Sequence, residues 1–190
     1  MSNSSALAPG CWSDGALPRN VQLGGGTIIT GEGAFRRFQS KRDSALVIGG
    51  NCTMDGVQFS LGEDGRVTIG DFCYFTNAVL LADCELRIGS YVMIGWNAVI
   101  ADSDFHPIAP AARLLDAVAL SPLGDRRARP TFVSRAVVIE DDVWIGPTAT
   151  ILKGVRLGAG CFVEPGALVA HDVPPRARVA GNPACIIGET

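Results

Sequence analysis

The sequence predicts an all-β fold, a three-sided parallel solenoid in which the chain turns a corner about every six residues. Large aliphatic side chains recur at intervals of six, and a small or β-branched residue lies four positions after each of them. Glycine follows many of the large aliphatics directly, where a turning backbone benefits from a residue without a Cβ. One large and one small inward side chain per side form a core only when coils of about 18 residues stack on one another.

The six-residue register runs through most of the chain, and Ile48 with Met54 predicts its first coil. The longest run of large aliphatics is Ile139, Ile145, Ile151, Leu157, Val163 and Val169. The earlier run is Ile69, Phe75 and Leu81, followed after one inserted residue by Ile88, Ile94 and Ile100. The small column is Cys52, Cys73, Val79, Val92, Ala98, Val143, Ala149, Val155, Cys161, Ala167 and Val173. Helical spacing is absent from these stretches, which favours strands.

The register divides the chain, which we expect to be a single domain, into five segments. Residues 1–45 are predicted to cap the solenoid, 46–101 to form the first coils, 102–135 an active-site loop, 136–173 the C-terminal coils, and 174–190 a tail whose prolines end the coiling. The loop is too long for a simple connection, and long loops on rigid scaffolds often carry function. Its segment ARLLDAVAL predicts a short helix.

The composition argues against several kinds of partner. With 190 residues, 47% of them hydrophobic, and a net charge of −3, the chain offers no basic face to a nucleic acid. No segment approaches the roughly 18 apolar residues of a membrane span, and the first ten residues lack the pattern of a secretory signal, so we expect a cytoplasmic protein. The six cysteines contain no CxxC pair, which argues against a metal site, and three of them, Cys52, Cys73 and Cys161, are small residues of the repeat.

Only two histidines are present, and His106 is the candidate general base. It lies at the start of the long loop, in Asp102-Ser103-Asp104-Phe105-His106-Pro107. An imidazole titrates near neutral pH and can accept a hydroxyl proton, and a carboxylate from Asp102 or Asp104 would fix its tautomer. The alternative is a polar surface turn. His171 is expected to be a surface residue.

The strings IGSYVMIGWNAVIA and VVIEDDVWIGPTATILKGVRLGAGCFVEPGALV resemble hexapeptide-repeat acyltransferases of the sugar and xenobiotic O-acetyltransferase type. The resemblance covers most of residues 48–184. It implies a left-handed parallel β-helix, a homotrimer with active sites between subunits, and acetyl-CoA as co-substrate. It also implies that the histidine of the loop, followed here by Pro107, deprotonates the acceptor hydroxyl.

The same resemblance suggests acceptor-binding residues. Trp144, in the string DDVWIGP, would lie beside the active site, although an outward aromatic is equally explained by a packing or trimer contact. Asp83 aligns with an acidic residue that binds acceptor hydroxyls, across the one inserted residue, and a solvated turn carboxylate is the alternative. Asn77 is a further candidate.

For coenzyme A, the resemblance implies a groove lined by backbone atoms of Gly146, Pro165 and Ala170, with Lys153 and Arg178 as the basic residues in or beside it. The chain departs from the family where relatives carry a basic residue after the string GNPA, because Cys185 stands there. The basic residues that would replace this phosphate contact, or else form a solvated cluster, are Arg176, Arg178, Arg126, Arg127 and Arg129.

These residues predict an O-acetyltransferase that moves acetyl from acetyl-CoA directly to a hydroxyl of a sugar, nucleotide sugar or polysaccharide precursor, without a metal. A thioester is already activated, so direct attack needs only a base, an oxyanion donor and alignment. The alternatives are a xenobiotic or antibiotic acceptor, an amine acceptor, and a non-catalytic β-helix scaffold. Two histidines cannot supply the three zinc ligands of a γ-type carbonic anhydrase.

Overall fold

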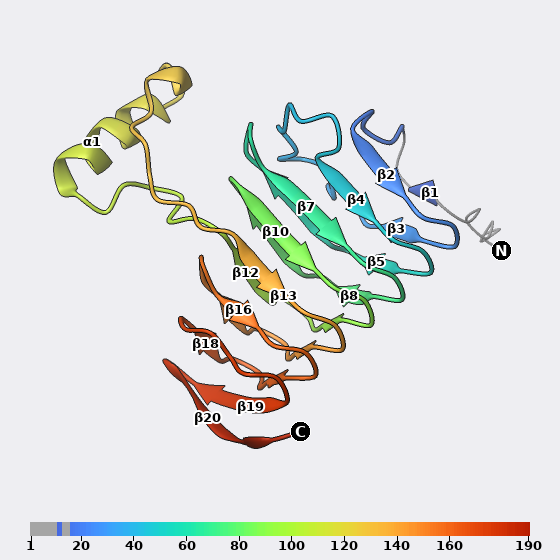
Figure 1. Ribbon diagram of the computed structural model, residues 1–190. Helices are drawn as coiled ribbons and strands as arrows, with labels where there is room; N and C mark the ends of the chain where they lie inside the picture. Colours follow the sequence, from blue (N-terminus) through green and yellow to red (C-terminus); the bar gives the residue numbers. More distant parts are fainter. Residues whose placement is uncertain (1–10, 13–15) are drawn as a thin grey trace, which may run out of the picture.

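The computed structural model describes residues 11–12 and 16–190, which form a mostly-β parallel solenoid of about seven turns with three sheets and one α-helix. Figure 1 shows the coils stacked from the N-terminal to the C-terminal end, with the helix standing to one side. The three sheets, here called A, B and C, are the three sides of the solenoid. The chain passes from sheet B to sheet A to sheet C and then returns to sheet B one coil further on.

The strands are short, and neighbouring coils pair in parallel throughout the solenoid. Sheet A comprises β1 (Cys11–Trp12), β3 (Ile28–Thr30), β5 (Thr53–Asp55), β8 (Tyr74–Thr76), β11 (Met93–Ile94), β14 (Trp144–Ile145), β17 (Phe162–Val163), β19 (Ala177–Gly181) and β20 (Ala184–Glu189). Sheet B comprises β2 (Val21–Leu23), β4 (Leu46–Ile48), β7 (Arg66–Ile69), β10 (Glu85–Ile88), β13 (Val137–Ile139) and β16 (Arg156–Leu157). Sheet C comprises β6 (Gln58–Leu61), β9 (Val79–Ala82), β12 (Val99–Ala101), β15 (Thr150–Ile151) and β18 (Leu168–Val169).

The predicted aliphatic columns form the core. Aligned residues from successive coils lie on one another, as in the row Ile69, Ile88, Ile139, Leu157 of sheet B. The corner glycines allow this close stacking: a Cβ on Gly49 would lie 2.6 Å from the carbonyl carbon of Gly70 in the next coil. The six-residue period therefore identifies the side chains that are buried in the core.

One coil departs from the predicted register. Leu81 and Val79 are only half-buried, whereas Leu80 and Ala78 point into the core. Phe75 pairs with Ile94 and Leu80 with Ile100, so this coil turns from sheet A to sheet C with one residue fewer than the next. Asn77, in the left-handed region at φ 47°, makes that tighter turn.

Parallel pairing between coils begins earlier than the predicted first coil at residue 46, since β1 already pairs with β3. Strand β2 pairs with β4, and β3 pairs with β5. Leu23 and Ile29 stand six residues apart, with Thr27 fully buried in the small column. The long turn over residues 31–45 separates this coil from the next and hides its register in the sequence.

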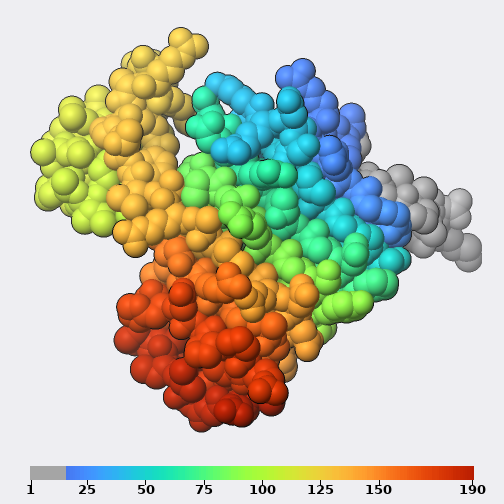
Figure 2. Space-filling model, viewed as in Figure 1, coloured from blue at the N-terminus to red at the C-terminus, as the bar shows by residue number. Residues whose placement is uncertain are grey.

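The loop of residues 102–135, here called the excursion, leaves between β12 and β13, at the corner between sheets C and B. Its helix α1 (Pro110–Ala119) confirms the predicted helix and begins two residues earlier, because proline is well suited to the first turn. A short 3₁₀ helix, η1 (Arg126–Ala128), follows. In Figure 2 the excursion forms a lobe beside the stacked coils.

Coiling continues past Pro174 and Pro175, where the tail was expected to end it. Strand β19 pairs in parallel with β17, and β20 then folds back antiparallel on β19. The prolines lie in the turn before β19, where no ladder hydrogen bond is lost. No helix among the described residues is long and apolar enough to cross a membrane.

Candidate functional site at the corner between sheets C and B

The corner between sheets C and B, called the C–B corner, gathers most of the predicted site residues. Each of these residues lies in a connection that leaves sheet C toward sheet B, and the last of these connections reaches sheet B through the bridge of Val173 to Leu157. The connections belong to consecutive coils, which a parallel ladder spaces by about 5 Å. They supply Asp83, Asp102, Asp104, His106, Lys153 and Ala170.

His106 follows a strained turn at the root of the excursion. Phe105 adopts a φ of 60°, which is unusual for a bulky residue, and the His106 N–H donates to the Asp104 carbonyl oxygen at 2.6 Å. The imidazole is 55% exposed. Its Nδ1 lies 2.6 Å from Oδ2 of Asp116, a residue of helix α1. The candidate base is therefore accessible on one side and held on the other.

The carboxylate beside His106 is thus Asp116, and not Asp102 or Asp104 as the sequence suggested. Asp116 is 1% exposed, and Arg129 Nε donates to its other oxygen, Oδ1, at 2.7 Å. Hydrogen bonds from Arg129 and from His106 lower the pKa of Asp116 to about 2. Sequence reasoning missed Asp116 and considered Arg129 only as a phosphate contact, because it sought partners of the histidine only among adjacent residues.

Asp102 and Asp104 have other partners. Asp102 is fully buried and accepts from the backbone N–H groups of Asp83, Cys84 and Glu85 at 2.7–2.8 Å, so it closes the turn of the preceding coil. Asp104 Oδ1 lies 2.5 Å from Lys153 Nζ. This ion pair ties the excursion to the following coil and occupies a lysine that was expected to bind coenzyme A.

Asp83 lies at the same corner as His106, one coil before the excursion. Its Oδ2 accepts a hydrogen bond from Ser103 Oγ at 2.5 Å. Burial raises the pKa of Asp83, the charge of Asp102 adds to that effect, and Ser103 and Arg129 oppose it. A half-buried carboxylate at the same corner as a candidate base is a suitable acceptor for substrate hydroxyls.

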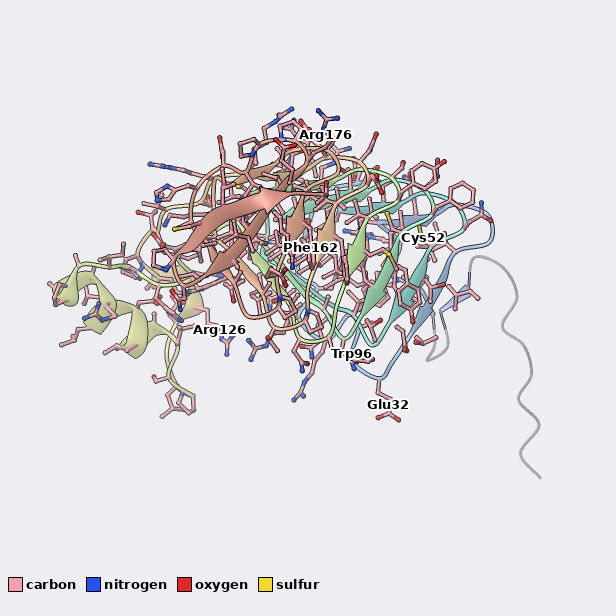
Figure 3. The ribbon with its side chains drawn as sticks, turned by 90° about the horizontal axis from the view of Figure 1, so that it is seen from below. Glu32, Cys52, Trp96, Arg126, Phe162 and Arg176 are labelled. Atoms are coloured by element: carbon pink, nitrogen blue, oxygen red, sulfur yellow. The ribbon has the colours of Figure 1, made fainter. Side chains whose placement is uncertain are left out.

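Trp144 and Arg178 lie on the outer face of sheet A, away from the C–B corner. The Trp144 ring is stacked on Phe162 with centroids 4.2 Å apart, and half of its surface is exposed. Arg178 lies over the same Phe162 ring, with its guanidinium carbon 5.6 Å from the ring centroid, and forms an ion pair with Glu164. Figure 3 labels Phe162 on the solenoid and Arg126 on the excursion at its side.

The remaining candidates lie at the corner between sheets A and C. Gly146 and Pro165 stack there in consecutive coils, with a Cβ on Gly146 only 2.6 Å from Pro165 N. Asn77 shapes the same corner in an earlier coil. Together with the exposed Ala170 at the C–B corner, Gly146 and Pro165 frame sheet C in the last coils. His171 is exposed beside Ala170.

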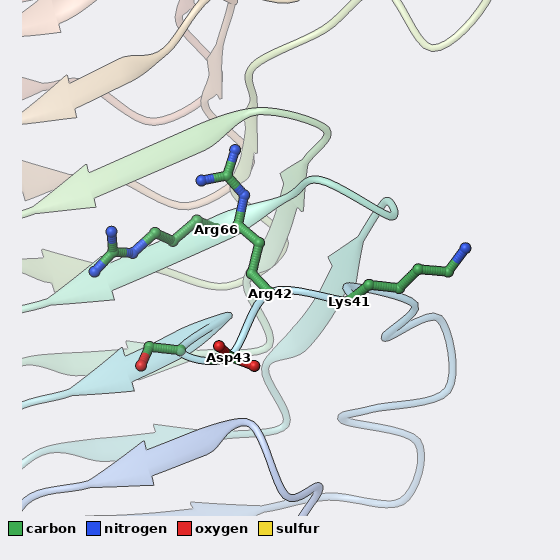
Figure 4. Close-up of a pocket in the computed structure, with 5 residues that line it drawn as sticks. Lys41, Arg42, Asp43 and Arg66 are labelled. Carbon is green, nitrogen blue, oxygen red and sulfur yellow. The ribbon is translucent and has the colours of Figure 1, made fainter.

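A basic depression lies on the C–B corner of the early coils. Lys41, Arg42, Asp43, Ser44 and Arg66 line it (Figure 4). Lys41 forms an exposed ion pair with Glu63. Within residues 11–12 and 16–190, no three His, Cys, Asp or Glu side chains converge as metal ligands.

Comparison with known proteins finds both a family with this repeat and relatives with similar sequences. The family model for bacterial transferase hexapeptide (six repeats) matches residues 136–171. A galactoside O-acetyltransferase of Lactococcus lactis subsp. lactis is 29% identical over 140 residues, which are 73% of this chain and 60% of the relative. The chain thus spans less than two thirds of that curated relative.

Two solved structures give the same result. A hexapeptide-repeat containing acetyltransferase from Vibrio cholerae is 31% identical, with a TM-score of 0.55 over 73% of this chain and 69% of that one. Its complex with acetyl coenzyme A matches with 31% identity and a TM-score of 0.53, over 70% of this chain and 63% of that one. The repeat, the fold and this likeness show that the chain belongs to the hexapeptide-repeat acetyltransferase family.

Proposed function

We propose that the protein transfers the acetyl group of acetyl-CoA to a hydroxyl of a sugar or sugar-containing acceptor, with His106 as general base. The observation that carries the proposal is the state of the imidazole: Nδ1 is engaged by Asp116, while Nε2 has no partner among the described residues and the ring is 55% exposed. Binding of acetyl-CoA by the Vibrio cholerae relative supports the donor.

The reaction follows from this arrangement. Nε2 takes the proton of the acceptor hydroxyl as its oxygen attacks the thioester carbonyl carbon. The C–O bond forms, and the carbonyl oxygen becomes an oxyanion that a backbone N–H stabilises. The tetrahedral intermediate collapses with cleavage of the C–S bond, and the imidazolium returns the proton to the thiolate of coenzyme A. The acetyl group is then on the acceptor oxygen, the proton is on the coenzyme A thiol, and no protein nucleophile is needed.

Asp83 is the proposed acceptor ligand. It shares the C–B corner with His106, and a carboxylate can accept hydrogen bonds from two neighbouring sugar hydroxyls. Ser103 occupies one lone pair of Oδ2 and leaves the other acceptor positions of the carboxylate for substrate. The galactoside substrate class of the Lactococcus lactis relative fits this recognition of hydroxyls.

The donor site is proposed along sheet C of the last coils, between Gly146 with Pro165 on one side and Ala170 on the other. Corner backbones there approach a ligand closely, as an extended pantetheine arm requires. Lys153 and Arg178 already hold carboxylates, so phosphate binding by either must compete with Asp104 or Glu164. Exposed arginines of the excursion and tail are the remaining sources of positive charge.

A homotrimer with shared sites completes the proposal. Trp144 lies on sheet A and His106 at the C–B corner, so a site that uses both must draw them from two copies. The half-exposed Tyr74, Met93 and Trp144 give sheet A the apolar outer face of an interface.

The test is to incubate the protein with acetyl-CoA and a panel of sugars, nucleotide sugars, amino sugars and hydroxylated antibiotics, following release of the coenzyme A thiol. We expect turnover with a hydroxylated sugar and a loss of at least about 100-fold in kcat for His106→Ala. Full kcat in His106→Ala would refute the base. Turnover confined to antibiotics or amines would refute the sugar hydroxyl, and absence of coenzyme A binding by calorimetry would favour a scaffold.

A further inference from the structure

We propose that Asp116 and Arg129 are positioning residues that hold His106 as its Nδ1–H tautomer and leave Nε2 to take the proton. This inference rests on the proposed function and adds the part played by the excursion. Neither residue lies in the repeat, and both come from the segment that separates the two halves of the solenoid. Their geometry assigns the chemically active atom of the base.

The carboxylate of Asp116 determines the tautomer. An ionised carboxylate only accepts hydrogen bonds, so the 2.6 Å contact between Oδ2 and Nδ1 requires the proton to be on Nδ1. In the neutral ring, Nε2 then carries the lone pair. Asp116 stays ionised at neutral pH, since its partners hold its pKa far below that range. The base is therefore set for proton transfer at Nε2 before an acceptor arrives.

Arg129 holds this carboxylate in place. Its Nε donates to Oδ1 at 2.7 Å, and one terminal nitrogen donates to Oδ2 at 3.3 Å, so the guanidinium contacts both oxygens. A carboxylate that is 1% exposed needs such a counter-charge, because an unpaired buried charge is strongly destabilising. Asp116 can remain a buried anion beside the base only while Arg129 is present.

Arg129 also fixes the backbone that presents the histidine. The same terminal nitrogen donates to the Phe105 carbonyl oxygen at 2.8 Å. Phe105 is the residue with a φ of 60°, and a strained turn persists only where its surroundings hold it. One guanidinium thus fixes both the orientation of the ring and the turn from which the ring projects. The guanidinium also lies over the Phe132 ring, with its central carbon 5.2 Å from the ring centroid.

Helix α1 delivers the carboxylate. Asp116 and Ala119 form its buried side, whereas Leu114, Leu115 and Val118 are exposed on the rest of its surface. The contact with His106 spans ten residues of chain and depends on how the excursion folds. Displacement of α1 would therefore release the imidazole without disturbing the solenoid core.

The decisive measurement is the protonation of the His106 ring nitrogens in the full-length protein, by long-range ¹⁵N–¹H NMR with His106→Ala used for assignment. In the neutral ring we expect Nδ1 to be protonated and Nε2 unprotonated, and we expect a mixture of tautomers in Asp116→Asn. A wild-type ring protonated at Nε2, or an unchanged tautomer in Asp116→Asn, would overturn the proposal. This readout needs no substrate.

Kinetics give the second arm. Asp116→Asn should lower kcat about 100-fold with a KM for acceptor within a few-fold, because the ring is no longer held as the tautomer with its lone pair on Nε2. The other charged groups of the C–B corner, Asp104, Lys153 and Asp83, are left in place by the substitution. Arg129→Lys should retain more kcat than Arg129→Met.

The matched controls are Asp125→Asn, which changes an exposed acid of the same excursion, and Arg87→Met, which changes an exposed arginine on sheet B. Both should keep kcat within about two-fold, and circular dichroism with the melting temperature checks folding of every variant. An inactive His106→Ala with a fully active Asp116→Asn would refute the positioning role alone. A fully active His106→Ala would refute the proposed base itself.

Discussion

Trp144 and His106 lie on different faces of one chain: the tryptophan projects from sheet A, and the histidine leaves the corner between sheets C and B. Within the described solenoid, β14 is held in sheet A by pairing with β11 on one side and β17 on the other, so Trp144 cannot reach that corner of its own chain. If both residues serve one acetyl transfer, a second copy of the chain must supply one of them.

Mixed assemblies of His106→Ala and Trp144→Ala subunits should therefore recover activity. In a random mixture of equal amounts, about a quarter of the inter-subunit sites combine an intact histidine with an intact tryptophan. We expect the co-expressed and co-purified mixture to exceed the summed activity of the two variants alone. Recovery should approach a quarter of the wild-type kcat per subunit.

The control is His106→Ala co-expressed with the double variant His106→Ala/Trp144→Ala, which contains no intact base and should stay inactive. Additive activities in the first mixture, despite mixed oligomers shown by native mass spectrometry, would mean that the two residues do not share a site.

Asp83→Asn should lower activity and raise stability. Burial raises the pKa of Asp83, so the folded protein prefers this carboxyl protonated, and its ionisation at neutral pH costs folding free energy. Asparagine removes that charge while its oxygen can still accept from Ser103. The loss of a charged acceptor for sugar hydroxyls should cost about 10-fold or more in kcat/KM.

Chemical denaturation at pH 7 and steady-state kinetics measure the two effects on the same protein. Ser60→Ala, a half-buried position elsewhere on sheet C, is the control for an unrelated polar change. An Asp83→Asn protein with both wild-type activity and lower stability would assign Asp83 a structural role only.

The solenoid was predictable from sequence because its period is repeated in every coil. Each inward position is specified by a large or a small apolar residue, and stacking repeats the same environment. Errors arose where the spacing changed. The corner at Asn77 is one residue shorter, so Leu80 is buried in place of Leu81, and the long turn after Thr30 hides the coil of Leu23 and Ile29. Local counting cannot detect such changes without the partner strand.

The site was predictable only in part. His106 could be found because a histidine at the start of a long loop is rare in this chain. Its partner could not, because Asp116 and Arg129 meet His106 through the irregular path of the excursion, which has no period. The adjacent acids Asp102 and Asp104 misled for the same reason: closeness in sequence does not determine closeness of side chains in a turn.

Acid should release the excursion before it unfolds the solenoid. The folded pKa of Asp116, about 2, lies below the ordinary aspartate value of about 3.9. A lowered carboxyl pKa contributes stability that is complete above about pH 4 and is lost as pH falls toward 2. Protonation of Asp116 removes the anion that holds Arg129 and His106.

Hydrogen exchange of residues 105–130 from pH 5 to pH 2, corrected for the intrinsic pH dependence of exchange, measures this release. We expect protection of α1 to fall in that window while the strands of sheet C keep theirs. Asp116→Asn should have lower protection at pH 5 and little further loss on acidification. Equal acid responses of the variant and the wild type would show that another carboxyl controls the excursion.

Alanine at Gly49 should destabilise the protein, whereas alanine at Gly25 should not. A Cβ at Gly49 would lie 2.6 Å from the carbonyl carbon of Gly70, so two coils would have to separate. Overpacking of this kind costs about 1–3 kcal/mol. At Gly25, in the preceding coil, no atom lies within 4 Å of the added Cβ, and the same substitution meets no neighbour. Urea denaturation of Gly49→Ala, Gly25→Ala and the wild type checks this. Equal stability of the two variants would show that close coil stacking at this corner does not require glycine.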